Sequence, residues 1–336
     1  MATLKTRLAE GLARLPGRRA PVKGWSLVTE WLHRHAHRQS VDVVHQSAYR
    51  VKLRLDLRDY TQRGMFYDAY ETQELNFMEE VLRPGDVVID VGANIGLFTL
   101  VAARAVGPSG SVHAFEPVPG NCERLEENVQ LNGFTNVRLN KSAVRDRAGT
   151  VALAIDAEMA RTSGASTSSF FTVTQLADPV REVTAQAETI DDYSTREVAN
   201  RSIRLVKIDV EGSEPAVLAG MSDVLKSHRV DVLMLEVSLY GLARSGSRIL
   251  DVVEPLRTAG YDLYRLGVGG LLTRWSYLGE PSIPERGGGE AGMIRGLYKG
   301  LQDLSRLFNL VAIRSDHPAM TGRPRFMSAG KLRRSA

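Results

Sequence analysis

A short turn with an acid before it and an asparagine inside it offers the first chemistry in this sequence. The stretch VVIDVGANIGLFTL, residues 87–100, passes from β-branched residues through Gly92, Asn94 and Gly96 into a helix-forming segment. A dinucleotide site needs G-x-G-x-x-G, so that bare backbone can approach a pyrophosphate. Here Asn94 takes the second glycine position, and Asp90 would repel the phosphates. The same acid suits a ligand that carries an ammonium group.

A second acid lies where a ribose needs an acceptor. Glu116, in SVHAFEP, ends the next predicted strand 20 residues after Gly96, where a carboxylate can accept both ribose hydroxyls. S-adenosylmethionine has an ammonium, a sulfonium and a ribose but no phosphate. The sequence therefore predicts an S-adenosylmethionine site that is formed by Asp90, Gly92, Asn94, Gly96 and Glu116.

The elements that position these residues alternate between strand-like and helix-like stretches, a pattern typical of a parallel sheet with helices on both faces. The predicted strands are 86–91, 111–116, 136–141, 203–209, 230–237, 261–266 and 308–314. Amphipathic stretches lie between them, and several close on glycine, as helices do. The predicted fold is α/β, with a Rossmann-like, doubly wound, mostly parallel seven-stranded sheet.

Four blocks of this sequence resemble those of the FkbM-type methyltransferases, a family of class I S-adenosylmethionine-dependent enzymes. They are GDVVIDVGANIGLFTL, HAFEPVPGNCERLEENVQLNG, LVKIDVEGSEPAVLAGM and NLVAI, in the family's order over roughly residues 65–315. The resemblance is specific chiefly because KIDVEG accompanies DVGANIG. It implies a class I methyltransferase fold and methyl transfer, mostly to oxygen, on sugars, glycolipids or polyketide-like metabolites.

Two further cofactor contacts are expected from position. Tyr70 and Glu71 begin a predicted helix before the first strand and resemble the family's corresponding block, which implies that Glu71 contacts the cofactor. Ser142 follows the third predicted strand, where the adenine edge usually lies in this fold.

Acids at the tips of two later strands are the candidates for catalysis. RLVKIDVEGSEP places Asp209 at a strand tip and Glu211 on the following loop, and Glu236 ends the next strand. Sites in open parallel sheets form outside the carboxyl ends of the strands, so we expect these acids beside the methyl donor. Lys207 shares a strand face with Asp209, so it can pair with that acid or position the acceptor.

Two uses of these acids remain open. Asp209 can act as the general base that takes the proton from an acceptor hydroxyl. Alternatively, Asp209 with Glu211 or Glu236 holds Mg²⁺, which acidifies a coordinated hydroxyl. Each acid also has a structural interpretation, such as Glu211 bonding to loop amides and Glu236 pairing with a basic side chain.

Composition limits the class of protein. The chain has 336 residues, of which 43% are hydrophobic, and a single cysteine, Cys122, which excludes an intrachain disulfide. The longest apolar stretches fall short of the roughly 20 residues of a membrane span, and the start has no apolar signal core. We therefore expect a soluble, cytoplasmic protein without a membrane span, as a monomer or an oligomer.

Charge divides the chain into three parts. Residues 1–64 hold 13 Lys/Arg against 5 Asp/Glu, residues 317–336 hold 5 against none, and the part between holds 25 against 34. We predict a basic extension over 1–64, a methyltransferase domain over 65–316 with an insert near 276–305, and a basic tail over 317–336. The basic ends lack nucleic-acid motifs, so no nucleic-acid partner is expected.

Other functions stay open on the sequence alone. The leading one is O-methylation of a small-molecule, glycan or glycolipid acceptor. The alternatives are N-methylation, a non-catalytic module that binds S-adenosylmethionine or a nucleotide, and a dinucleotide-dependent oxidoreductase, which the absent glycines and Asp90 disfavour.

Overall fold

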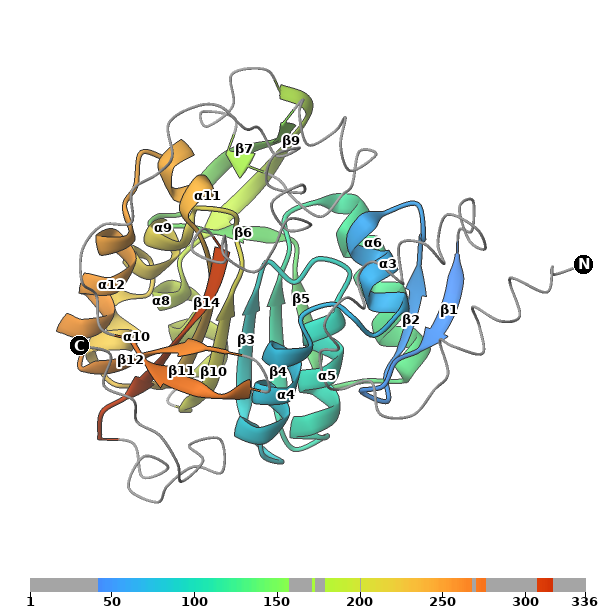
Figure 1. Ribbon diagram of the computed structural model, residues 1–336, viewed down its shortest axis with the longest axis horizontal. Helices are drawn as coiled ribbons and strands as arrows, with labels where there is room; N and C mark the ends of the chain where they lie inside the picture. The colour runs from blue at the N-terminus through green and yellow to red at the C-terminus, as the bar shows by residue number, and fades with distance from the viewer. Residues whose placement is uncertain are drawn as a thin grey trace, which may run out of the picture.

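A single large sheet forms the centre of the molecule (Figure 1). The computed structural model describes residues 42–156, 171–172, 179–199, 201–267, 270–275 and 307–316. The sheet has eight strands in the order β13-β12-β14-β11-β10-β3-β4-β5. They are β3 Val87–Val91, β4 Ser111–Phe115, β5 Val137–Asn140, β10 Ile203–Ile208, β11 Val230–Ser238, β12 Tyr261–Leu266, β13 Leu272–Arg274 and β14 Leu307–Arg314.

The predicted fold class is confirmed, with one strand more than the predicted seven. Strands β5, β4, β3, β10 and β11 pair in parallel, and β14 is antiparallel to both β11 and β12. The additional strand, β13, pairs with β12 at the edge of the sheet. Its three residues are half-buried or exposed. A strand this short, with no buried face, gives no alternation of apolar and polar residues by which it could be predicted.

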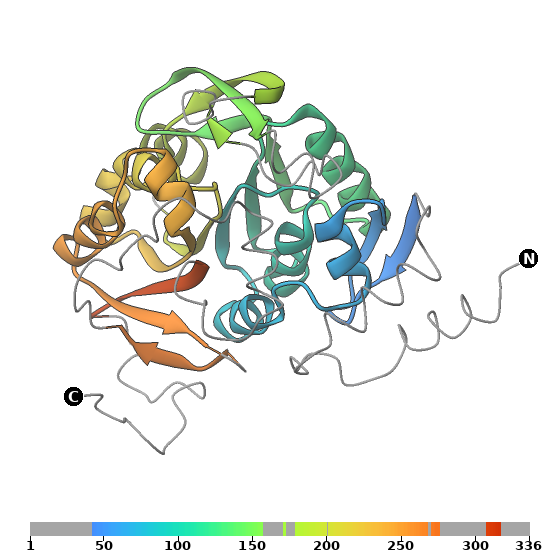
Figure 2. The same ribbon diagram turned by 45° about the horizontal axis from the view of Figure 1, so that its top comes forward.

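Helices cover both faces of the sheet, which explains why its central strands are continuous apolar runs. All five residues of β3 are buried. Val88 packs in one core with α4 and α5, whereas Val87 and Ile89 pack in a second core with α9 and α12. Figure 1 and Figure 2 show these two helical layers. The helices are α4 Thr72–Val81, α5 Leu97–Val106, α6 Pro119–Asn132, α8 Ile190–Tyr193, the π-helix η3 Ser194–Val198, α9 Glu214–Ala219, α10 Ser222–Lys226, α11 Leu239–Arg244 and α12 Ile249–Thr258.

The amphipathic stretch after the fourth predicted strand is two short helices rather than one. α9 ends at Ala219 and α10 begins at Ser222. Between them, a Cβ atom on Gly220 would lie 1.9 Å from the carbonyl oxygen of Arg145. The chain turns there because a neighbouring loop passes against its backbone, which the apolar spacing did not show.

The described part of the predicted basic extension packs on the main core. It forms β1 Val43–Gln46, β2 Lys52–Leu55 and α3 Tyr60–Phe66. Leu53 and Leu55 are fully buried in the same core as α4 and α5. The predicted boundary after residue 64 therefore falls inside a helix that belongs to the main body of the protein.

A second, smaller sheet lies at the carboxyl edge of the large one (Figure 1). Its order is β6-β9-β7-β8, and its strands are β6 Ser142–Val144, β7 Gly149–Asp156, β8 Phe171–Thr172 and β9 Pro179–Glu188. The sequence analysis assigned no strands to this region. β6 begins two residues after β5 ends, which brings the small sheet to the edge where the candidate site lies.

Several predictions concern parts outside the described residues, including the insert near 276–305 and the tail over 317–336. Among the helices that the structure describes, none is long and apolar enough to cross a membrane.

Candidate active site

The candidate site lies at the carboxyl ends of β3, β4, β10 and β11. After β3 the chain continues to β4 on one side, whereas β10 and then β11 follow on the other side. This is the reversal of strand order at which open α/β sheets bind ligands. Most of the predicted site residues lie near the ends of these strands or in the loops that follow them, whereas Glu71 precedes α4 and Ser142 begins β6.

The glycine turn after β3 is packed against the loop that carries Asp209. Gly92 has φ +82°, and a Cβ atom there would lie 1.9 Å from the carbonyl oxygen of Asp209. The Asp209 amide in turn donates to the carbonyl oxygen of Val91 at 3.0 Å. Asn94, also in the left-handed region with φ 51°, accepts the Ile95 amide at 2.7 Å. The turn therefore has a fixed shape and no room for a side chain at Gly92.

Asp90 lies beneath this turn and is 1% exposed. The Thr99 hydroxyl donates to its Oδ2 atom at 2.6 Å, while Oδ1 has no hydrogen-bond partner among the described residues. Burial raises the pKa of Asp90, and the nearby Lys207 opposes that rise. This oxygen can accept a hydrogen bond from a cationic ligand, which fits the predicted ammonium group.

Glu116 is held by donors from its own surroundings. Its Oε2 accepts the Asn94 amide at 2.8 Å, and its Oε1 accepts the Val118 amide at 2.9 Å and Asn121 Nδ2 at 3.2 Å. Burial nevertheless raises the pKa of Glu116 to about 7. Because a carboxylate accepts about four hydrogen bonds, roughly one position remains. The carboxylate thus suits one ribose hydroxyl more readily than the expected two.

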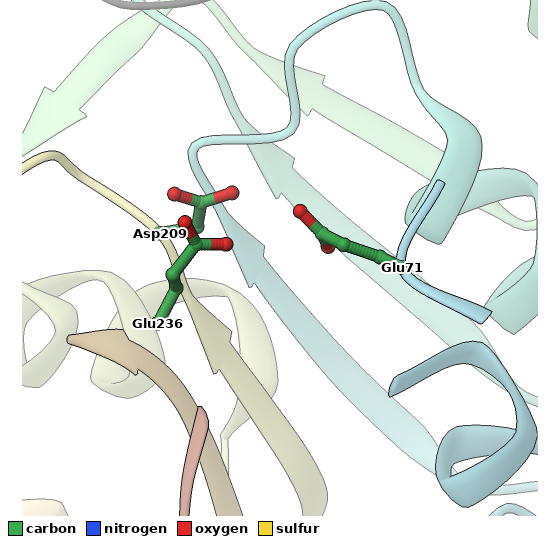
Figure 3. Close-up of side chains that lie close together, drawn as sticks. All are labelled: Glu71, Asp209 and Glu236. Atoms are coloured by element: carbon green, nitrogen blue, oxygen red, sulfur yellow. The ribbon is translucent and has the colours of Figure 1, made fainter. Parts of the chain in front are cut away.

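Three carboxylates converge beside the turn, and we call Glu71, Asp209 and Glu236 the acid cluster (Figure 3). One oxygen from each lies within 4.8 Å of the others, and all three residues are half-buried. Asp209 directly follows β10, and Glu236 lies near the end of β11. Glu71 precedes α4 in a left-handed conformation with φ 43°. The predicted convergence of Asp209 and Glu236 is present in the structure.

Glu211 was the third acid predicted to lie beside Asp209 and Glu236. It is not part of the acid cluster, whose third member is Glu71. Glu211 lies on the loop after Asp209 with φ 51°. A Cβ atom on the next residue, Gly212, would lie 2.2 Å from the backbone of Gly241. This close contact fixes the loop against the start of α11. The loop amide of Gly212 donates to Glu214 at 2.9 Å, so Glu214 has the loop-bonding role considered for Glu211.

Lys207 connects the two halves of the site. Its Nζ donates to Asp209 Oδ2 at 3.0 Å, as the shared strand face predicted, and lies 4.5 Å from the centre of the Phe98 ring. Burial acts to lower the pKa of Lys207, but the carboxylates of Asp209, Asp90 and Glu71 outweigh it and hold that pKa above its ordinary value. Lys207 is therefore a fixed positive charge.

If all three acids of the cluster were ionised, they would carry more negative charge than Lys207 can neutralise, so the cluster holds protons. Burial, reinforced by Asp209, raises the pKa of Glu71 to about 8 despite the opposing effect of Lys207. Burial and the neighbouring carboxylates also raise the pKa of Glu236 well above its ordinary value. A site of this kind gains stability from a bound cation.

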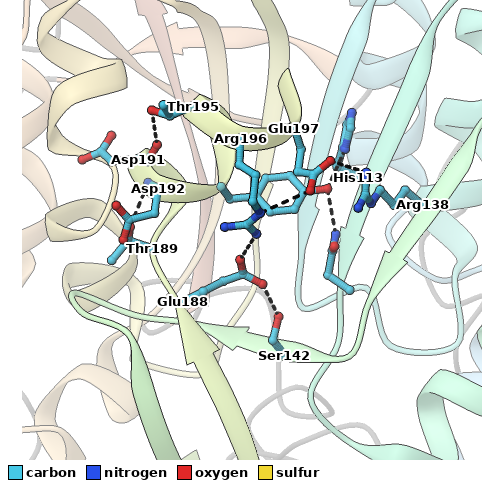
Figure 4. A network of polar contacts seen from close by, with 12 residues as sticks. His113, Arg138, Ser142, Glu188, Thr189, Asp191, Asp192, Thr195, Arg196 and Glu197 are labelled. Atoms are coloured by element: carbon cyan, nitrogen blue, oxygen red, sulfur yellow. Dashed lines mark hydrogen bonds and ion pairs between the residues drawn. The ribbon is translucent and has the colours of Figure 1, made fainter. Parts of the chain in front are cut away.

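Ser142 and His113 belong to a polar network behind the site (Figure 4). The Ser142 hydroxyl donates to Glu188 at 2.8 Å, so its proton is engaged within the small sheet. His113 lies between the Tyr193 hydroxyl at 2.7 Å and the Ser111 hydroxyl at 3.1 Å. Burial lowers the pKa of His113 to about 4. Both ring nitrogens of His113 thus have partners within the protein.

Fold and site together define a class I methyltransferase architecture, and comparison with known proteins gives the family. The model of the methyltransferase FkbM domain matches residues 90–263. The chain is 35% identical over 216 residues to the 31-O-demethyl-FK506 methyltransferase FkbM of Streptomyces tacrolimicus, a match that covers 55% of this chain and 81% of that protein. The chain belongs to the FkbM methyltransferase family and is a methyltransferase.

More distant matches cover smaller parts. Methyltransferase 1 of Beauveria bassiana is 28% identical over 147 residues, 40% of this chain and 58% of that protein. The ribosomal RNA large subunit methyltransferase E of Chromobacterium violaceum is 33% identical over 95 residues, 27% of this chain and 39% of that protein. Among solved structures, an S-adenosylmethionine-dependent O-methyltransferase from Thermotoga maritima is 12% identical with a TM-score of 0.36, and the match covers 73% of this chain and 65% of that one.

Several contacts of the site could not be predicted from the sequence. The Thr99 hydroxyl donates to Asp90, and the Phe98 ring lies next to Lys207. Thr99 and Phe98 are in the first turn of α5, where the sequence does not distinguish them from other helix residues. Asn309 on β14 donates to Glu74 on α4. No spacing in the sequence could have signalled that pair, because 235 residues separate its members.

Proposed function

We propose that this protein is an S-adenosylmethionine-dependent O-methyltransferase that acts on a hydroxyl of a sugar, glycolipid or secondary metabolite. The acid cluster beside the glycine turn carries the proposal, because an alcohol needs a nearby base before it can attack a methyl group. The Streptomyces tacrolimicus relative supports it, since its name describes methyl transfer to an oxygen of FK506.

The cofactor would lie along the turn between β3 and α5. S-adenosylmethionine supplies a methyl group on a positively charged sulfur. Asp90 offers an unpartnered buried oxygen below the turn, and Glu116 keeps roughly one acceptor position for a ribose hydroxyl. Gly92, Asn94 and Gly96 shape the backbone that would face the ligand, and Glu71 would contact it from the start of α4. The acids of the site suit a ligand with two cationic groups, because such a ligand would favour their ionised forms.

Asp209 is the proposed base. Its Oδ2 atom accepts from Lys207 at 3.0 Å, which orients the carboxylate and leaves Oδ1 to take the proton of the acceptor hydroxyl. Lys207 itself stays positive and would remain in place through the reaction. Glu236 and Glu211 are the alternative bases, and the raised pKa of Glu236 brings its basicity closer to neutral pH.

The acid cluster also fits a second arrangement, in which it holds a divalent cation. Three carboxylate oxygens within 4.8 Å of one another are the hard ligands that Mg²⁺ prefers. An ion there would acidify a coordinated acceptor hydroxyl. The ligands would be Glu71, Asp209 and Glu236, whereas the sequence suggested Asp209 with Glu211 or Glu236.

The charge of the site also bears on the acceptor. A carboxylate-rich site repels the phosphates of a polynucleotide, which supports an uncharged or cationic acceptor and the proposed absence of a nucleic-acid partner. The relatives named as ribosomal RNA methyltransferases make RNA the alternative to exclude. An amine acceptor, and hence N-methylation, is the other alternative.

Calorimetry and a methyl-transfer screen together test the proposal. The protein should bind S-adenosylmethionine and not NAD, and it should transfer labelled methyl groups to components of glycan, lipid or polyketide extracts. Base-stable labelled ethers in the product would support oxygen as the acceptor. Binding without transfer would favour the non-catalytic module, and labelled RNA or labelled amines would contradict the proposed acceptor class.

A further inference from the structure

A hydrogen bond joins the last strand of the sheet to the helix that starts beside the acid cluster. Asn309 Nδ2 on β14 donates to Oε1 of Glu74 on α4. Glu74 is 6% exposed. It lies three residues after Glu71, so the two acids occupy the same side of the first helical turn. The bond therefore acts on the part of α4 that sets the position of Glu71.

The other end of this bond is fixed by the sheet. β14 pairs with β11, and in that register Asn309 lies directly opposite Glu236. Paired residues in antiparallel strands have Cβ atoms about 4.5–5.5 Å apart. Asn309 is thus held next to Glu236 by the pairing of β14 with β11. Its bond to Glu74 therefore connects the start of α4 to the part of the sheet that carries Glu236, a member of the acid cluster.

The charges around Glu71 indicate why this bond matters. Glu71 interacts unfavourably with Asp209 and with Glu74, and Lys207 is the cation that opposes this effect. These acids repel one another whenever they are ionised, and the turn before α4 has no side-chain cap of its own at Glu71. A neutral amide donor satisfies Glu74 without adding charge or competing with Lys207 for the acid cluster.

We propose that Asn309 and Glu74 are positioning residues for the methyl-donor site. The bond between them holds the first turn of α4 against β14 and keeps Glu71 beside Asp209 and Glu236, where Glu71 contributes to S-adenosylmethionine binding. The proposal rests on the proposed function, in which Glu71 contacts that cofactor. It assigns a role to two residues that do not themselves touch a ligand.

The test uses the full chain and S-adenosylmethionine as the probe in calorimetry. Asn309→Leu keeps the size of the side chain and removes the donor, and we expect the Kd to rise about fivefold to tenfold, as for the loss of one hydrogen bond. Glu74→Gln keeps an acceptor oxygen for Asn309 and should leave the Kd within about twofold. If Asn309→Leu does not fold, Glu74→Met removes the same bond from the other side and should give the same loss.

A double variant separates positioning from general stability. Because the bond acts through Glu71, Asn309→Leu should add less than about twofold to the Kd of Glu71→Gln. The matched control is Asn136→Leu, since Asn136 donates to the carbonyl oxygens of Ala103 and Gly107 at the opposite edge of the sheet. That variant should lower the melting temperature and leave the Kd unchanged.

The outcomes are distinct. Failure of the wild-type protein to bind S-adenosylmethionine would overturn the proposed function. Wild-type binding with an unchanged Kd in Asn309→Leu would overturn the positioning role alone. Full additivity with Glu71→Gln, or an equal loss of affinity in Asn136→Leu, would show that the bond only stabilises the fold.

Discussion

Glu116 and the acid cluster are two carboxylate sites at the same edge of one sheet, and they are built in opposite ways. Glu116 accepts three hydrogen bonds from residues 94–121, all within its own loops. The acid cluster gathers its carboxylates from α4, β10 and β11, and Lys207 forms an ion pair with Asp209. The Glu116 carboxylate is oriented by the protein's own donors before a ligand arrives, whereas the crowded acids of the cluster hold protons that a bound cation would displace.

The difference shows how the work of a transferase can be divided. A carboxylate that is fixed by backbone donors keeps one geometry, which suits recognition of a constant cofactor. A group of crowded carboxylates changes its protonation when a cation or a hydroxyl enters, which suits proton transfer. Binding should therefore depend mainly on the first site and turnover mainly on the second.

The largest expected effect is on turnover. Asp209→Asn keeps the shape of the side chain but removes the basic oxygen, so single-turnover methyl transfer should fall about 10²-fold to 10⁴-fold while the affinity for S-adenosylmethionine stays near that of the wild type. A chelator should have no effect on the wild-type rate if Asp209 is the base.

The same measurement sharpens the assignment. Recovery of Asp209→Asn by excess Mg²⁺, with loss of wild-type activity in a chelator, would favour the cation arrangement. An undiminished rate in Asp209→Asn would move the base to Glu236 or Glu211.

Gly92 should break the separation between the two sites, because it packs against Asp209 and its amide donates to the carbonyl oxygen of Phe115, the residue before Glu116. A Cβ atom there would meet the carbonyl oxygen of Asp209 at 1.9 Å, and alanine is also strained at a φ of +82°. We expect Gly92→Ala to destabilise the fold by about 1–3 kcal/mol or more and to lower both cofactor affinity and turnover. Thermal unfolding, calorimetry and rate measurements on one preparation check this. A variant impaired in only one property would show that the two loops move independently.

Glu116→Ala should affect binding alone. Loss of a hydrogen bond to a charged group is expected to weaken S-adenosylmethionine binding by about 1–3 kcal/mol, and calorimetry measures it directly. The control is Glu127→Ala on α6, because Glu127 has 53% of its side chain exposed and forms ion pairs at 3.6 Å with Arg54 and Arg124. Unchanged affinity in Glu116→Ala would remove Glu116 from the cofactor site.

The smallest effect is a pH dependence of the free protein. Burial raises the pKa of Glu71 to about 8 and that of Glu116 to about 7, from an ordinary value of 4.5. The folded protein thus holds protons that the unfolded chain has released, so stability should fall as the pH rises from about 4.5 to about 8. Glu71→Gln should flatten the upper part of this profile of melting temperature against pH. A profile that rises over the same range would contradict the raised pKa values.

The features that could be predicted from the sequence are those that depend only on neighbouring residues, such as the runs of residues that form strands and the acids at their ends. β3 and β12 were placed within one residue because glycine turns bound two short runs that are rich in aliphatic or aromatic residues. Asp90, Glu116 and Asp209 were placed at or near strand ends because strands end where such runs end. The pairing of Lys207 with Asp209 followed from the two-residue period of a strand.

Features that depend on distant segments could not be found in this way. Glu71 joins the acid cluster through the position of α4, and the loop that carries Glu211 is set by the backbone contact between Gly212 and Gly241. The small sheet formed by β6 to β9 is held by pairing between strands on either side of residues 157–170. Each requires three-dimensional packing that no periodicity records.

The place of β14 in the sheet has a consequence for how this protein comes into being. This strand, the last that the structure describes, lies between β11 and β12 and pairs with both. The sheet therefore cannot join β11 to β12 through β14 until residues 307–314 have been synthesised. Such non-local pairing is slow to form. During synthesis on the ribosome, the backbone edge of β11 stays open, and Glu74 lacks Asn309. If Asn309 positions Glu71 as proposed, the site can be completed only after β14 has joined the sheet, and S-adenosylmethionine binding should reach its full strength only then.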